Sequence, residues 1–216
     1  LREKLATIGV KPPPPKTLSP DWLKFWRTGE YIEKWATRSI TDISVIDRFE
    51  LGYISEDDAL AIPIHDRSGV PLGAVRRFFN GTPKYKYPKG VKISQCLYGF
   101  TQIANLEKQP KTIAVVEGSI DALASWQHGL PAVALLGARA STRQLELLNA
   151  LSPSSIAVLT DNDQAGRVAA SQLISGLAGS GIIPLVPSTW PHNCKDVGDM
   201  NEEEFKTTID SLGRCW

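Results

Sequence analysis

Three groups of acidic residues in the C-terminal half have the types and spacing that suit metal chemistry. They are Glu117 with Asp121, Asp161 with Asp163, and Asp196 with Asp199. Apolar runs typical of strands precede them, at 113–116, 156–159 and 182–186. Loops at the carboxyl ends of parallel strands meet at one edge of an open sheet, so these carboxylates are expected to converge. Hard oxygen ligands favour Mg²⁺ or Mn²⁺ over Zn²⁺, which predicts magnesium-dependent phosphate chemistry.

The spacing within each group fits this interpretation. Asp161 and Asp163 are one residue apart and can both face one cation, while Gly166 lets the next helix approach closely. Asp121 lies one helical turn after Glu117. With Asp196 these carboxylates supply enough oxygens for one or two Mg²⁺ ions, together with water and substrate phosphates. The alternative for any single group is that its Asp forms a turn or caps a helix.

The elements that would position these carboxylates alternate regularly from Lys111 onward. Strands are expected at 113–116, 133–136, 156–160 and 182–186, and helices near 120–128, 142–151, 165–176 and 201–212. Two of the helix starts, at Ser141 and Asn201, have the spacing of a capping box. Repeated β–α units predict a parallel, doubly wound sheet over residues 109–216.

Residues 21–108 have the pattern of a smaller α+β subdomain. Short helices with an aromatic apolar face are expected after Ser19, and another helix from Thr41 or Asp42. Strands are expected at 59–64 and 71–79, with a third extended segment at 84–87. Residues 1–20 include the run Pro12 to Pro15 and are predicted to be a linker or tail.

The net charge of +1 conceals an uneven distribution. Residues 1–110 contain 17 Lys and Arg against 12 Asp and Glu, whereas residues 111–216 contain 7 against 11. Seven basic residues lie between Arg67 and Lys92, and no acid occurs between Asp66 and Glu107. Such a run with interleaved aromatics indicates a polyanion partner that stacks its bases. A basic hairpin with its aromatics in the core is the equal alternative.

Composition excludes several other classes of protein. The three cysteines are far apart and form neither a zinc knuckle nor a disulfide framework, so reduced thiols and a cytoplasmic location are expected. No apolar stretch is long enough for a membrane span. The first residues include no initiating Met and no apolar signal core, which is typical of a segment of a longer chain.

Four segments of the C-terminal half together resemble the motifs of the TOPRIM fold, which primases, topoisomerases and some nucleases share. They are 115–123 (VVEGSIDAL), 136–138 (LGA), 159–167 (LTDNDQAGR) and 195–196 (KD). The earlier segments 48–53 (RFELGY), 62–69 (IPIHDRSG), 83–85 (PKY) and 97–100 (LYGF) resemble those that precede TOPRIM in bacterial-type primases. The chain is therefore identified as resembling a primase RNA-polymerase core or a close phage or plasmid relative.

The resemblance implies an activity and a set of site residues. The activity is template-directed synthesis of short RNA primers from nucleoside triphosphates on single-stranded DNA. Glu117, Asp161 and Asp163 would bind the catalytic Mg²⁺ or Mn²⁺, with Glu117 alternatively a general base. Further contacts would come from Asp121 and Asp196 to a second metal or the triphosphate, from Lys84, Lys92 and Lys195 to nucleotide phosphates, and from Arg67, Arg76 and Arg77 to the template.

The sequence departs from the family pattern at a few positions, and two rival functions remain. Ser119 and Ile120 replace an aromatic residue and Met, and Gly198 replaces a frequent Asp. A zinc-binding module and a replicative helicase would be partners outside these residues. The rivals are a TOPRIM nuclease and a non-catalytic accessory protein that binds single-stranded nucleic acid.

Overall fold

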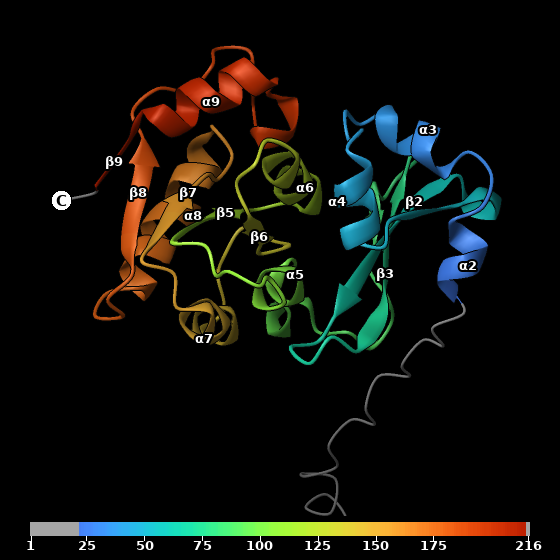
Figure 1. Cartoon of the computed structure of the whole chain (residues 1–216), viewed down its shortest axis with the longest axis horizontal. Coiled ribbons are helices and arrows are strands. Elements are labelled where there is room, and N and C mark those ends of the chain that lie inside the picture. The colour runs from blue at the N-terminus through green and yellow to red at the C-terminus, as the bar shows by residue number, and fades with distance from the viewer. Residues whose placement is uncertain (1–21, 215–216) are drawn as a thin grey trace, which may run out of the picture.

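The computed structural model describes residues 22–214, which form two β-sheets with helices packed around them (Figure 1). One sheet has four strands in the order β1-β2-β3-β4, and the other has five in the order β6-β5-β7-β8-β9. The predicted α/β class is confirmed, with an antiparallel sheet first and a mostly parallel sheet second. No helix within the described residues is long and apolar enough to cross a membrane.

The first sheet is antiparallel throughout. Its strands are β1 (Gly52–Ile54), β2 (Ala59–His65), β3 (Pro71–Phe78) and β4 (Tyr85–Lys86). Residues 59–64 of β2 are all buried, and its two faces pack differently. Leu60, Ile62 and Ile64 join the main core, whereas Ala61 on the other face packs in a small separate cluster. The three extended segments predicted here are confirmed, and β1 is an additional strand that the sequence patterns did not indicate.

Three short helices precede and cover this sheet, namely α2 (Trp22–Trp26), α3 (Tyr31–Ala36) and α4 (Ile43–Arg48). The predicted start of α4 is confirmed, since the Asp42 side chain accepts a hydrogen bond from the Ser44 N–H at 2.8 Å. Trp35 is fully buried, but Phe25 is 76% exposed, so the prediction that the aromatics form one apolar face is wrong for Phe25. Trp26 packs on the sheet, and its helical neighbour therefore points away. The predicted tail at 1–20 lies outside the described residues.

The second sheet carries the acidic loops. Its parallel strands are β5 (Thr112–Val116), β6 (Ala132–Ala134), β7 (Ser155–Val158) and β8 (Ile183–Pro187). An edge strand, β9 (Leu212–Arg214), pairs antiparallel with β8. The predicted parallel sheet is confirmed for β5 to β8, and β9 is an additional antiparallel edge strand, which at three residues is too short to show a strand pattern in the sequence.

Four longer helices cover both faces of the second sheet. They are α6 (Ser119–Gln127), α7 (Thr142–Leu151), α8 (Gln164–Gly176) and α9 (Glu202–Asp210), and a short helix, α5 (Phe100–Ala104), precedes β5. Successive residues of β5 contribute to different clusters, Val116 packing with α6 and α9, and Val115 with α7 and α8. Both predicted capping boxes, at Ser141 and Asn201, are confirmed.

The two sheets share one hydrophobic core. Phe49 of the first half packs against Tyr98 and Trp126, with ring centroids 5.3 and 5.5 Å away. The Gln127 side-chain oxygen accepts hydrogen bonds from the N–H groups of Thr41 at 2.7 Å and Asp42 at 3.0 Å. These contacts hold the basic strands of the first sheet opposite the acidic loops of the second.

Candidate metal and nucleotide site

A pocket of about 270 Å³ lies where the carboxyl ends of β5, β6 and β7 meet. Its acidic lining residues are Glu117, Asp121, Asp161 and Asp196, and its basic ones are Lys84 and Lys195. The loops after β5 and β7 thus bring together Glu117 and Asp161, 44 positions apart in the chain, as expected at this edge of an open sheet. Asp196, after β8, and Lys84, from the first sheet, line the same pocket. Asp163 lies two residues beyond Asp161 on the same loop.

Glu117 and Asp161 are neighbours because β5 and β7 are neighbouring strands. The Asp161 N–H lies 3.3 Å from a Glu117 carboxylate oxygen and donates to it. Burial raises the pKa of Glu117 above its ordinary value, and the negative charge of Asp161 raises it further. This pair therefore gathers negative charge that a cation would stabilise.

Asp163 has one oxygen committed to the fold. It is the N-cap of α8, and its side chain accepts a hydrogen bond from the Gly166 N–H at 2.9 Å, which lowers the pKa of Asp163. The helix-cap interpretation therefore describes one of its oxygens, while the other lies 3.8 Å from the Lys195 Nζ. A Cβ on Gly166 would lie 1.9 Å from the Asp161 carbonyl oxygen, so the predicted close approach of α8 is confirmed.

A second pair of carboxylates is formed by Asp121 and Asp196. Asp121 is buried and accepts hydrogen bonds from the N–H groups of Gly118 at 3.1 Å and Gly198 at 3.0 Å. Burial, followed by the charge of Asp196, raises the pKa of Asp121 well above its ordinary value. A Cβ at Gly198 would lie 3.1 Å from an Asp121 carboxylate oxygen and 3.2 Å from one of Asp196, so a larger residue there would crowd this pair.

The carboxylates match the ligand chemistry of a hard divalent cation, but they are not already arranged around one point. Within residues 22–214 no three His, Cys, Asp or Glu side chains are grouped as a metal site. Instead Lys195 Nζ lies 2.9 Å from an Asp161 carboxylate oxygen, and Asp121 faces backbone N–H groups. Oxygen ligands gathered in two close pairs, with the pKa of three of the carboxyls raised, fit a divalent cation.

A second pocket of about 260 Å³ continues from the first and shares Lys84, Tyr85, Asp121 and Asp196 with it. Its remaining basic lining residues are Arg38 and Arg77. Arg77 is only 4% exposed, donates from Nε to the Tyr85 hydroxyl at 3.2 Å, and has no partner for Nη1 among the described residues. Burial and the neighbouring Arg77 lower the pKa of Arg38. Two arginines lining one pocket, one of them with an unsatisfied buried donor, have the chemistry that would suit an anion.

Arg38 is the functional candidate that the sequence patterns missed. It lies 29 positions before the acid-free run that begins at Arg67, and no motif marks it. The contact appears only in the fold, because α3 and the residues after it lie beside β3 and β4 at the pocket. Of the three arginines predicted to contact the template, only Arg77 lines a pocket described here.

The structure does not bring Arg67, Arg76 and Arg77 together. Arg76 and Arg77 are consecutive in β3 and point to opposite faces, and Arg76 forms an ion pair with Asp57. Arg67 is exposed in the turn between β2 and β3, away from the β4 end of that strand. Lys92 is also exposed, beside a 3₁₀ turn, and is not among the residues that line the two pockets. Binding roles for Arg67, Arg76 and Lys92 stay predictions.

The interleaved aromatics divide between the two interpretations given for the basic run. Phe79 and Tyr85 pack against the shared core, as in the basic-hairpin interpretation. Tyr87 is 38% exposed and lines the acidic pocket, where a base or ribose can contact it. Each interpretation therefore describes part of the segment.

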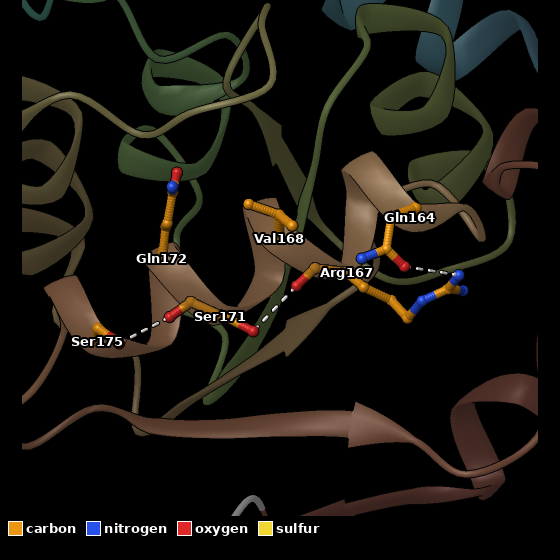
Figure 2. A pocket seen from close by; sticks show the side chains of 6 residues that line it. All are labelled: Gln164, Arg167, Val168, Ser171, Gln172 and Ser175. Carbon is orange, nitrogen blue, oxygen red and sulfur yellow. Dashed lines mark hydrogen bonds between the residues drawn. The ribbon is translucent and has the colours of Figure 1, made fainter.

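A separate hollow of about 470 Å³ runs along the exposed face of α8 (Figure 2). Its described lining residues are Gln164, Arg167, Val168, Ser171, Gln172 and Ser175, and the two serines hydrogen-bond to carbonyl oxygens of their own helix. No carboxylate is among them. This face lacks the acidic groups that metal chemistry requires, so the candidate site is the pocket at the strand ends.

Comparison with known proteins agrees with this geometry. Residues 114–202 match the family model described as Toprim-like. The chain is 38% identical over 117 residues to the DNA primase of Legionella pneumophila, covering 51% of this chain and 20% of that protein. It is 30% identical over 173 residues to the DNA primase of Thermotoga maritima, covering 77% of this chain and 29% of that protein. The matched segments thus span between a fifth and a third of the length of these relatives.

Solved structures have the same fold. A DnaG primase catalytic domain bound to single-stranded DNA superposes with a TM-score of 0.72 at 21% identity, over 89% of this chain and 77% of that one. The Aquifex aeolicus primase, comprising zinc-binding and RNA polymerase domains, gives 0.73 at 23% identity, over 89% and 59%. The primase fragment of the bacteriophage T7 primase-helicase protein gives 0.63 at 18%, over 96% and 85%.

Residues 114–202, which include most of the parallel sheet and its acidic strand ends, are therefore similar to a Toprim-like domain. Together with the antiparallel sheet before it, the chain has the architecture of a DnaG-type primase catalytic core.

Proposed function

We propose that this chain synthesises short RNA primers on single-stranded DNA by metal-dependent nucleotidyl transfer. The observation that carries the proposal is one groove with two chemically different walls. One wall has the carboxylates of Glu117, Asp121, Asp161 and Asp196, and the other has Arg38, Arg77 and Lys84. A triphosphate needs both, because a divalent cation and basic side chains share its negative charge.

In this mechanism Glu117, Asp161 and the free oxygen of Asp163 would hold Mg²⁺ or Mn²⁺. The ion would neutralise phosphate charge and align the attacking and leaving oxygens. Lys84 and Arg77 would bind the phosphates from the opposite wall, and Tyr87 would contact the sugar or base. The raised pKa of Glu117 also suits a general base that takes the proton of the 3′-hydroxyl.

The relatives and solved neighbours support the finer parts of the proposal. They are called DNA primases, and one solved catalytic domain is bound to single-stranded DNA. A primer-synthesising core would work with a zinc-binding module and a replicative helicase supplied by other segments or chains. Synthesis of primers on DNA would place it in the cytoplasm, where the buried free thiols of Cys96 and Cys194 would stay reduced.

A three-way assay tests the proposal against its rivals. The protein is incubated with single-stranded template, labelled ribonucleotides and Mg²⁺, and the products are separated by length. Primer synthesis gives new labelled oligonucleotides, a nuclease shortens the template, and an accessory protein only retards it. We expect new oligonucleotides with Mg²⁺ and none when EDTA is present from the start. Either of the other outcomes would contradict the proposal.

Lys84→Ala is expected to weaken binding of single-stranded DNA without changing its sequence preference. A phosphate contact on single strands contributes roughly 0.7 to the slope of log K against log salt, so the slope should fall by about that amount. Fluorescence anisotropy between 50 and 300 mM salt measures it, with Lys206→Ala on the exposed face of α9 as the control. Arg76→Ala tests in the same way whether the opposite face of β3 also contacts DNA phosphates. An unchanged salt slope for Lys84→Ala would indicate that the basic run is an ordinary solvated surface.

Asp196→Asn is expected to stabilise the metal-free protein near neutral pH. The pKa values of Asp196 and Asp121 are raised in the fold, so their ionisation destabilises the folded state as pH rises from the unfolded value towards the folded one. Removing one charge should therefore raise the melting temperature at pH 7.5 and change it little at pH 4, where the carboxyls are largely protonated in the fold. Thermal melts in EDTA measure the difference. Mg²⁺ should then raise the melting temperature of the wild type more than that of the variant, and a variant destabilised at both pH values would contradict this.

A further inference from the structure

The Lys195 side chain forms ion pairs with carboxylates of the candidate metal site, which binding a nucleotide phosphate does not require. Its Nζ lies 2.9 Å from Asp161 Oδ2 and 3.8 Å from Asp163 Oδ2, the two carboxylates that the proposed function gives to the metal. The Asp161 side chain is 18% exposed, whereas that of Lys195 is 62% exposed. The ammonium group therefore reaches the carboxylates from the solvent side of the pocket.

The backbone of Lys195 is held by two hydrogen bonds, whereas most of its side chain is exposed to solvent. Its N–H donates to Asp199 Oδ2 at 2.9 Å, and its carbonyl accepts from the Asn162 N–H at 2.7 Å. Asn162 lies between Asp161 and Asp163, so the loop with the lysine and the loop with the carboxylates are joined by a direct hydrogen bond. The four-carbon side chain can turn about its own bonds without moving either loop.

Asp199 acquires a role from this arrangement. Asp199 lines the second pocket but not the first, and its Oδ2 accepts a hydrogen bond from the Lys195 N–H. It is a positioning residue that holds the start of Lys195 in place. The anchor keeps the ammonium group within reach of the carboxylates.

We propose that Lys195 is a tethered counter-ion, which neutralises Asp161 and Asp163 until a divalent cation displaces it and then turns to the substrate phosphates. The inference rests on the proposed function for the identity of the anion. A monovalent ammonium and a divalent ion cannot share the same oxygens at close range, because like charges in contact repel strongly. Lys195 lines the same pocket as Lys84, so the displaced ammonium remains where phosphates would bind.

Two consequences follow from competition for the same oxygens. Removing the ammonium should tighten metal binding, because the ion no longer has to displace a resident charge. It should also weaken binding of a nucleoside triphosphate in the presence of metal, because one phosphate contact is lost. A lysine that contacts phosphate alone predicts only the second effect.

The experiment is a calorimetric titration of Mn²⁺ into the protein without nucleotide, comparing wild type with three variants. Lys195→Met removes the charge and keeps the length of the side chain, and Lys195→Arg keeps the charge. Lys84→Met removes the other lysine of the pocket, which contacts none of the described carboxylates at ion-pair distance, and so controls for net charge. We expect Mn²⁺ to bind Lys195→Met about tenfold more tightly, Lys84→Met within about twofold of wild type, and Lys195→Arg near wild type.

Lys195→Met that binds Mn²⁺ no more tightly than Lys84→Met would overturn the inference, as would the absence of Mn²⁺ binding in every variant. Because Lys195 is largely exposed, its substitution is expected to leave the protein folded, which circular dichroism checks. No primer synthesis enters this test. A wild type that makes no primers would contradict the proposed function and leave the Mn²⁺ comparison standing.

Discussion

Asp161→Asn and Glu117→Gln are each expected to reduce primer synthesis by more than about a hundredfold while leaving the protein folded. Amides replace carboxylates of nearly the same shape but cannot neutralise a divalent cation, and electrostatic stabilisation of phosphoryl transfer is worth at least this much. Folding should be little affected, because the ion pair that Asp161 forms with Lys195 is partly exposed and contributes about 0–1 kcal/mol. Labelled-product yield at saturating Mg²⁺ and a thermal melt measure the two effects.

Asp210→Asn provides the matched control for this pair of variants. Asp210 is exposed at the last residue of α9, away from the lining of both pockets. Its substitution should change neither yield nor melting temperature appreciably. Near-normal synthesis by Asp161→Asn or Glu117→Gln would show that these carboxylates do not carry the metal chemistry.

Gly166→Ala is expected to be the most destabilising single-methyl addition among the described glycines. The new Cβ would lie 1.9 Å from the Asp161 carbonyl oxygen, 2.7 Å from its carbonyl carbon and 2.9 Å from its nitrogen. All three atoms are backbone, so α8 must move away from the loop. Overpacking against a fixed backbone costs about 3 kcal/mol. In a protein of this size that lowers the melting temperature by roughly 6–12 °C.

The displaced helix should also affect chemistry. Because the Asp163 side chain caps α8 by accepting from the Gly166 N–H, and because a Cβ on Gly166 would meet Asp161, the variant should lose synthesis even below its melting temperature. Urea unfolding measures the stability loss, and Gly213→Ala in β9 is the control, since a Cβ there meets no atom within 4 Å. Equal stability of the two variants would contradict the close packing of α8 on the acidic loop.

The sequence was sufficient to predict the elements that carry the site. Apolar runs at 113–116 and 156–159 mark central parallel strands because both of their faces are buried, and the acidic residues follow where those strands end. The capping boxes at Ser141 and Asn201 define helix starts by local hydrogen bonding alone. Features of this kind depend on residues close together in the sequence and can be predicted without the fold.

Contacts between distant segments were not predictable in the same way. Asp121 is held by the N–H of Gly198, 77 positions later, and the alternation in β3 sends Arg76 and Arg77 to opposite faces of a sheet. Whether Phe25 or Trp26 faces the sheet depends on the rotation of a five-residue helix, which aromatic content does not determine. Arg38 joins the pocket only because the two sheets share a core.

The central claim, that the groove performs template-directed synthesis, is tested most directly by the sequence of the product. A short primer annealed to single-stranded DNA removes any requirement for initiation, and two templates that differ only in the next four bases are supplied with all four ribonucleotides and Mg²⁺. We predict that the added ribonucleotides are complementary to each template in turn, and that EDTA or Asp161→Asn prevents their addition. Added nucleotides that are the same on both templates, or templates that are cut or left unextended while Mn²⁺ is bound, would contradict the account.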